Sequence, residues 1–108
     1  MRTYDRPIEI LKQDENTEQY TLWDKCPKLH AYVNKSKDKE EYLSGEATQH
    51  QINLAFEVRY NSALKEIFDS PQLFRIRFDG VYFDIVDVDD YQLRHMTLKM
   101  LGVSVNGN

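Results

Sequence analysis

The sequence has 108 residues, a length that suits one domain with a modest hydrophobic core. Its 41% hydrophobic and 30% charged residues are typical of a soluble globular protein, and no apolar run approaches the roughly 20 residues that a membrane-spanning helix needs. The net charge of −4 argues against a dedicated nucleic-acid binder, and the first residues lack the apolar core of a signal peptide. Cys26 is the only cysteine, which excludes an internal disulfide and fits a reducing cytoplasm.

The first third of the chain predicts three short strands. Ile8 and Ile10 alternate with polar residues, so residues 7–12 should form a strand, and the polar residues 13–19 a hairpin loop. Residues 20–24 return as a second strand that would include Trp23. Residues 25–28 then break the chain before a third strand at residues 29–33.

Residues 35–45 carry many charges and few apolar groups, so they cannot contribute much to a core. They predict a loop that protrudes from the domain over residues 35–50, or a short helix in which Asp38 caps a turn through Leu43. Loops of this length in compact domains are often functional or disordered.

The clearest alternation in the chain lies at residues 51–60 and predicts a long, half-buried strand. Its inward residues would be Ile52, Leu54, Phe56, Val58 and Tyr60. Its outward residues would be Gln51, Asn53, Glu57 and Arg59. A short helix should follow, capped by Asn61 or Ser62 and ended by Ser70-Pro71. Its apolar face would consist of Ala63, Leu64, Ile67 and Phe68.

Asp79-Gly80 stands between two alternating runs and predicts a β-hairpin with a two-residue turn. Glycine tolerates the positive φ that this turn requires, and aspartate tolerates it better than most residues. Phe78 should then face Val81. The six apolar residues that would share one face are Phe74, Ile76, Phe78, Val81, Phe83 and Ile85. On the other face Arg77 should pair with Tyr82, and Arg75 with Asp84.

The alternation changes phase after Ile85, because Val86 and Val88 fall on the opposite parity. A β-bulge near Val86 and the end of the strand explain this equally well. Asp89-Asp90 should break the chain. A final strand should start with Met96, Leu98 and Met100 facing inward and change phase again at Leu101-Gly102, which leaves Val103 and Val105 on the other face.

Six or seven short strands with hairpin spacing, one short α-helix and a long charged loop predict a mainly β fold. The expected architecture is a small antiparallel β-barrel, or a barrel-like sandwich, that forms a single domain over residues 1–108. Closing the sheet would hide its edge strands.

The sequence contains no motif of an enzyme. It has neither a phosphate-binding glycine loop nor a nucleophile elbow, and His30, His50 and His95 lack ligand spacing. Four carboxylates could offer oxygen ligands to Ca²⁺, but no calcium-loop pattern is present. They are Asp84, Asp87, Asp89 and Asp90. We therefore expect no catalytic residue, metal or cofactor.

One basic region stands out in this acidic protein. It consists of Lys25, Lys28, Lys35, Lys37 and Lys39. These lysines could simply be solvated linker and loop residues. Alternatively, they could contact nucleic-acid phosphates or an acidic partner.

The order and spacing of several short motifs resemble the phage head–tail adaptor, or head-completion, family. The matching segments are Ile8-Glu9-Ile10, Trp23-Asp24, Ala31-Tyr32-Val33, Glu41-Tyr42-Leu43, Arg59-Tyr60 and the hairpin with Asp79-Gly80. The sequence departs from the family pattern at Asp14-Glu15-Asn16, where many relatives have a glycine-rich turn, and in the helix at residues 63–68.

This resemblance implies a small β-barrel protein of the virion neck, present in the host cytoplasm during assembly. Family members bind beneath the portal after DNA packaging, form a ring, and connect the head to the tail. The implied partners are therefore the portal or adaptor ring and the tail-completion proteins, with no membrane. Whether the role is that of adaptor, stopper or tail-completion protein stays open.

In the family the loop that corresponds to residues 35–50 reaches into neighbouring subunits or the DNA channel. The implied contact residues are Lys35, Lys37, Lys39, Glu40, Glu41, Tyr42 and Leu43. The lysines could meet DNA phosphates or acidic portal residues, while Tyr42 and Leu43 could anchor an adjacent subunit.

The alternative function is that of a small β-barrel that binds nucleic acid. Such a barrel would present aromatic side chains flanked by basic residues on one strand face. Here Phe74, Phe78 and Phe83 share the apolar face of the hairpin and are expected in the core, which favours the connector.

Overall fold

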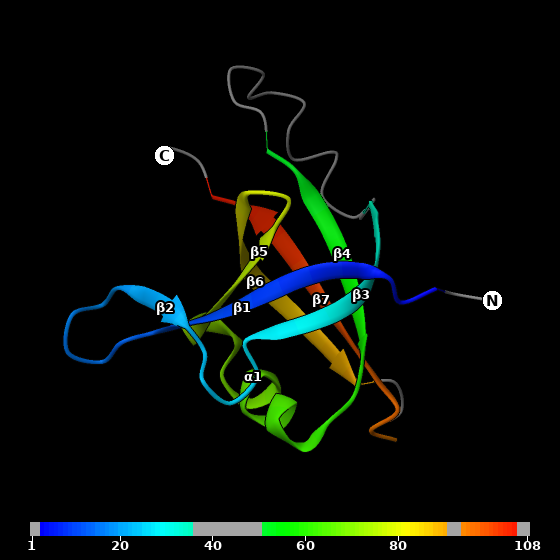
Figure 1. Ribbon diagram of the computed structural model, residues 1–108, viewed down its shortest axis with the longest axis horizontal. Coiled ribbons are helices and arrows are strands. Elements are labelled where there is room, and N and C mark those ends of the chain that lie inside the picture. Colours follow the sequence, from blue (N-terminus) through cyan, green and yellow to red (C-terminus); the bar gives the residue numbers. More distant parts are fainter. Residues whose placement is uncertain (1–2, 36–50, 91–93, 106–108) are drawn as a thin grey trace.

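The computed structural model describes residues 3–35, 51–90 and 94–105, in which six antiparallel strands close into a barrel (Figure 1). The sheet order is β2-β1-β3-β4-β7-β6-β5, and the additional pairing of β1 with β5 closes it. The strands are β1 (Arg6–Gln13), β2 (Tyr20–Leu22), β3 (Lys28–Lys35), β4 (Asn53–Arg59), β5 (Phe74–Phe78), β6 (Val81–Asp90) and β7 (Thr97–Ser104). The short strand β2 pairs antiparallel with the last residues of β1 and takes no part in closing the barrel. The predicted mainly β barrel is therefore confirmed.

One short helical segment covers an end of the barrel. Two 3₁₀ turns, η2 (Ser62–Leu64) and η3 (Pro71–Leu73), flank the helix α1 (Lys65–Asp69). The side chain of Asn61 caps the segment by accepting a hydrogen bond from the Ala63 backbone N–H at 2.9 Å. Leu64 and Ile67 are buried as predicted, whereas Phe68 is exposed. No described helix has the length and apolar character needed to cross a membrane.

The predicted hairpin register is confirmed. Phe78 pairs with Val81 and Ile76 with Phe83, and on the outer face Arg75 pairs with Asp84. The turn residues Asp79 and Gly80 both have positive φ, as a two-residue turn requires. Four of the six apolar hairpin residues are buried, namely Phe74, Ile76, Phe83 and Ile85. The other two, Phe78 and Val81, are half-buried.

A β-bulge explains the phase change in β6. The register shifts between Ile85 and Asp87, so Val86 and Asp87 both point outward and Val88 turns inward again. The expected break at Asp89-Asp90 is wrong, because the strand continues through Asp90 and buries its side chain. One extra residue thus restores the inward parity of the strand.

The expected phase change in β7 is wrong. The strand runs without a bulge, and its inward positions after Met100 are occupied by Gly102 and Ser104. A Cβ atom on Gly102 would lie 3.0 Å from Phe56 Cε1 and 3.0 Å from Phe83 Cβ. The two aromatic side chains fill the space, so a residue without a side chain takes an inward position.

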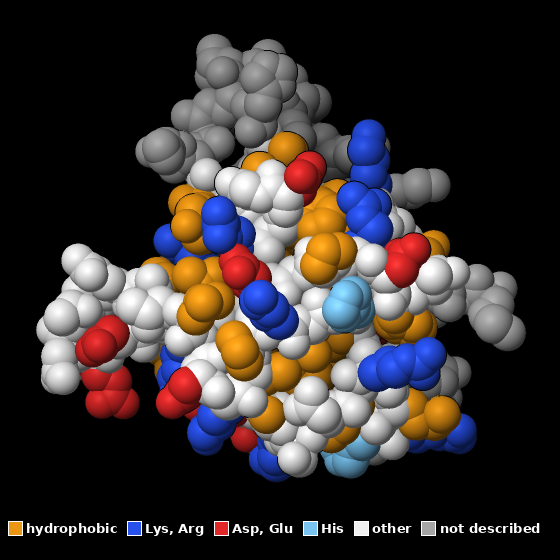
Figure 2. Space-filling view, viewed as in Figure 1, with side chains coloured by type: hydrophobic (Ala, Val, Ile, Leu, Met, Phe, Trp, Pro, Cys, Tyr) orange, Lys and Arg blue, Asp and Glu red, His pale blue; other side chains and the backbone are white. Residues whose placement is uncertain are grey.

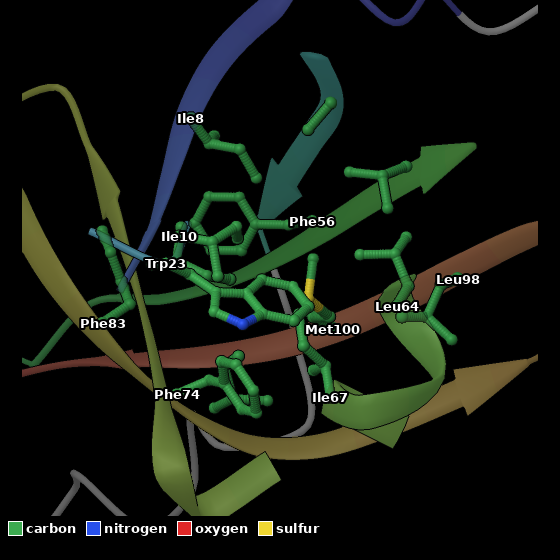
Figure 3. Packing of buried hydrophobic residues seen from close by; sticks show 14 residues of the cluster. Ile8, Ile10, Trp23, Phe56, Leu64, Ile67, Phe74, Phe83, Leu98 and Met100 are labelled. Atoms are coloured by element: carbon green, nitrogen blue, oxygen red, sulfur yellow. The ribbon is translucent and has the colours of Figure 1, made fainter. Parts of the chain in front are cut away.

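Three further expectations need correction. Ile52 and Met96 lie just outside β4 and β7 and are 46% and 68% exposed, because they precede the strands that would have turned them inward. Trp23 lies beyond the end of β2, and the chain turns its indole ring into the core (Figure 3). Its ring packs edge-on against Phe74, with 4.9 Å between centroids.

Pro7 lies within β1 although it lacks a backbone N–H. The Ile10 N–H points toward the β2–β3 connection, where it donates to Pro27 O at 2.9 Å. Since successive residues of a strand donate to opposite sides, the nitrogen of Pro7, three residues before Ile10, faces the other edge. There the pairing of β1 with β5 ends at Glu9 and Arg77, so no ladder bond is lost.

A charged contact ties the helical segment to the barrel. Glu66 of α1 accepts hydrogen bonds from Lys12 of β1 and, at 2.9 Å, from Lys25. The two lysines lower the pKa of the Glu66 carboxyl, with Lys12 making the larger contribution. The same contact raises the pKa of Lys25.

We predict that Gly102→Val lowers the free energy of unfolding by about 1–3 kcal/mol, because overpacking displaces Phe56 or Phe83. Urea denaturation measures the change. Lys99→Ala, at an exposed outward position of the same strand, is the control and should stay within about 0.5 kcal/mol of the wild type. Equal stability of Gly102→Val and the wild type would contradict the packing described here.

We also predict that part of the stability disappears in acid through Glu66. Its folded-state pKa lies below the ordinary value of 4.5, so its contribution is fully present above that value and is lost as the pH falls through the lowered pKa. Glu66→Gln should therefore be less stable than the wild type at pH 7, and the difference should shrink below pH 4.5. A difference that is the same at both pH values in urea titrations would exclude this role.

Candidate partner-binding surfaces

The sequence-predicted contact segment lies almost entirely outside the described residues. Lys35 is the exception: it is the exposed last residue of β3 and pairs with Leu54 of β4, so it belongs to a strand. The predicted contact residues outside the description are Lys37, Lys39, Glu40, Glu41, Tyr42 and Leu43. The β3–β4 pairing shows that this segment leaves and re-enters the barrel at neighbouring strands.

The loop at residues 14–19, here named the acidic loop, projects away from the barrel between β1 and β2 (Figures 1 and 2). Backbone hydrogen bonds close it: Asp14 N donates to Gln19 O at 2.7 Å and Glu18 N donates to Asp14 O at 2.8 Å. The Asp14 carboxylate also accepts a hydrogen bond from Asn16 N at 2.7 Å. Glu18 adopts a positive φ of 62°. The loop therefore has a defined turn structure although it contains no glycine.

On the outer face of β4 and β7 lies a groove of about 510 Å³, here named the β4–β7 groove. Its lining residues come from four segments of the chain: Tyr4, Glu57, Asp89, Arg94, Met96, Thr97 and Lys99. Pairing across the sheet places Lys99 opposite both Glu57 and Asp89. The groove thus combines charged side chains with the exposed thioether of Met96.

Glu57 occupies an outward position of β4, yet it is only 7% exposed. The Tyr4 hydroxyl donates a hydrogen bond to Glu57 Oε2 at 2.5 Å, and the guanidinium of Arg59 lies 4.8 Å from the centre of the Tyr4 ring. The segment before β1 therefore covers this carboxylate. The predicted outward position of Glu57 is confirmed, but its side chain is buried because alternation identifies the face of a strand and not what covers that face.

A second buried carboxylate fixes the rim of the groove. Both oxygens of Asp90 contact His95: one accepts a hydrogen bond from the backbone N–H at 3.0 Å, and the other lies 2.5 Å from the ring Nδ1. The His95 ring stacks on Tyr60 at 4.6 Å, and Tyr60 N donates to Met96 O at 3.0 Å. These contacts hold the two flanking residues, Arg94 and Met96, at the barrel end.

A third surface, on β5 and β6, bears on the nucleic-acid alternative. Arg75 lies 4.1 Å from the ring centre of Tyr20 and is paired with Asp84 at 2.8 Å. Arg77 lies 5.9 Å from the ring centre of Tyr82 and is paired with Glu9 at 2.9 Å. The arginines cover the rings that would stack on bases, and carboxylates neutralise them. The face shown in Figure 2 mixes both signs of charge with apolar side chains. This arrangement does not favour nucleic-acid binding.

The described residues contain no group of three or more His, Cys, Asp or Glu side chains that could hold a metal ion. Two of the four carboxylates considered as Ca²⁺ ligands are engaged elsewhere, Asp84 by Arg75 and Asp90 by His95. The free thiol of Cys26 is half-buried, with the amide nitrogen of Asn61 at 3.8 Å.

Sequence reasoning missed the β4–β7 groove. Tyr4, Glu57, Asp89 and Lys99 come from distant segments and follow no spacing pattern, so only the sheet order brings them together. The acidic loop carried a signal, since Asp14-Glu15-Asn16 departs from the glycine-rich turn expected there.

Comparisons with known proteins agree with this barrel. The family model described as phage head completion protein matches residues 4–103. A solution structure of a protein from Shigella flexneri 2a is 23% identical, with a TM-score of 0.57, and the match covers 99% of this chain and 96% of that one. A chain in the virion of a native gene transfer agent particle is 14% identical, with a TM-score of 0.55, and the match covers 99% of this chain and 100% of that one. Nothing among curated proteins matches.

The two structural likenesses establish the shared fold, and the family match extends over nearly all of the sequence. That match confirms the family to which the sequence motifs pointed and the class of phage structural protein. The chain belongs to the phage head completion protein family.

Proposed function

We propose that this protein is a connector in the neck of a tailed phage or prophage, which binds beneath the portal after DNA packaging and joins the head to the tail. The observation that carries the proposal is the family match over residues 4–103. The end-to-end likeness to a chain of a gene transfer agent virion supports a place in a particle.

In this proposal the protein acts by assembly and not by catalysis. It forms a homo-oligomeric ring in the virion neck, in contact with the portal or adaptor ring on one side and tail-completion proteins on the other. A pre-existing ring of partner subunits raises the local concentration of this chain, so weak contacts between neighbouring copies suffice. During assembly the protein is in the host cytoplasm.

The segment at residues 35–50 makes the contacts with neighbours or the DNA channel in this proposal. Lys35, Lys37 and Lys39 meet phosphates or acidic portal residues, and Tyr42 and Leu43 supply an apolar anchor. The support from the fold is positional. Lys35 and Leu54 pair directly, so the barrel is complete without the intervening segment.

We predict that replacing residues 36–45 by a short Gly/Ser linker leaves the thermal midpoint nearly unchanged, because the closure entropy of a loop depends only weakly on its length. Lys35 is kept because it belongs to β3. The same variant, placed in a phage that depends on this protein, should yield no DNA-retaining, tail-bearing particles in electron micrographs.

Two narrower variants divide the roles within this segment. Lys37→Gln with Lys39→Gln removes charge, and Tyr42→Ser with Leu43→Ser removes the apolar anchor. Normal head completion by the linker variant would show that the segment is dispensable. Failure of the linker variant to fold would show that the replaced residues contribute to the core.

We further predict that the isolated protein is monomeric at micromolar concentration. Among the described residues six large apolar side chains are exposed, whereas obligate oligomers bury a large apolar interface. Sedimentation velocity measures the state. A stable ring without any partner protein would be incompatible with assembly on a pre-existing ring.

A further inference from the structure

The acidic loop presents concentrated negative charge on an exposed turn. Residues 14–19 are all exposed and contain three carboxylates, Asp14, Glu15 and Glu18, with no lysine or arginine among them. The loop is held in shape by its own hydrogen bonds, and β2, which holds its far end, takes no part in closing the barrel. A rigid loop loses little conformational entropy on binding. A surface complementary to this loop should be cationic, because the loop carries three carboxylates, and concave, because the loop projects from the barrel.

The β4–β7 groove meets both requirements. Its exposed charged lining residues are two cations, Arg94 and Lys99, and one carboxylate, Asp89. A third exposed cation, Arg59, lies beside Tyr4. Among the described residues, none of the three cations forms an ion pair. Glu57 adds a buried carboxylate beneath the Tyr4 hydroxyl, so the groove together with Arg59 keeps an excess of one positive charge.

The loop and the groove lie on opposite sides of the molecule. In Figure 1 the loop before β2 projects at the left, whereas the end of β6 and the start of β7 lie at the lower right. The two surfaces therefore cannot meet within one chain. They can meet between copies that have the same orientation.

We propose that the acidic loop of one copy binds in the β4–β7 groove of the next copy. Such a contact joins two different surfaces of the same chain, so it is heterologous and repeats around a ring when the rotation closes. Glu15 and Glu18 face Arg94 and Lys99 across this contact, and Met96 packs against the loop backbone. The assignment rests on the ring proposed above and identifies the surfaces by which neighbouring copies meet.

Two single-cysteine proteins test this contact at high protein concentration. Asn16→Cys places a thiol in the acidic loop and keeps its three carboxylates, and Met96→Cys places one in the groove and keeps its cations. Both carry Cys26→Ser. With a short bis-maleimide, the mixture should give a cross-linked dimer, whereas each protein alone should give almost none. A chain with both new cysteines should give a ladder of larger species.

Charge reversal adds a matched control. Arg94→Glu with Lys99→Glu should reduce the cross-link about tenfold, and so should Glu15→Lys with Glu18→Lys, because like charges then face each other. Mixing the reversed groove with the reversed loop should restore the cross-link. Lys28→Glu with Lys65→Glu, which changes the charge equally at exposed sites outside the groove, should leave the yield unchanged.

The outcomes separate this contact from the connector function. Absence of a cross-link in the mixture, or no restoration by the paired reversals, would overturn the contact between loop and groove. Equal cross-linking of the Asn16→Cys protein with itself would indicate a symmetric dimer and would also overturn it. The connector function is tested independently by head completion in the phage, and it would survive either result.

Discussion

The pairing of β1 with β5 is the constraint on which the rest of this structure depends. These strands are far apart in the sequence, and their pairing from Glu9–Arg77 to Lys12–Phe74 converts an open antiparallel sheet into a closed barrel. Closure gives the inward faces of six strands a common interior, in which Phe56, Phe74 and Phe83 are almost completely buried (Figure 3). It also leaves no long exposed edge in the barrel, the usual route to uncontrolled pairing between chains.

The narrow interior of this barrel accounts for several local features. Phe56 packs edge-on against both Phe78 and Phe83, and Gly102 provides the space between Phe56 and Phe83. The helical segment covers one end with Leu64 and Ile67 and is tied to β1 through the ion pair of Glu66 with Lys12. These details are consequences of filling a small closed volume at the density of a protein core.

Closure also leaves the outer surface and the connections free to carry function. The acidic loop and the segment between β3 and β4 both emerge from hydrogen-bonded strand pairs, so their composition is not constrained by the core. The outer face of β4 and β7 is different, because there a buried carboxylate, Glu57, lies beneath Tyr4 in a groove whose cations form no ion pair within the described part of the chain. Burial of a carboxylate is costly unless hydrogen bonds compensate it, and at Glu57 the Tyr4 hydroxyl contributes one.

The sequence by itself determined the features that depend on local periodicity. The register around Asp79-Gly80 and the mainly β class follow from alternation and turn chemistry. The bulge near Val86, the cap at Asn61 and the barrel were each one of two predicted alternatives, and the structure decided among them. Only the tertiary structure decided what depends on neighbours across the sheet. Phe56 and Phe83 left room only for Gly102 at an inward position of β7, and His95 satisfied Asp90 where a chain break was expected. Sheet order assembled the β4–β7 groove from distant segments. Alternation reports which face of a strand a residue occupies, whereas burial depends on what packs over that face.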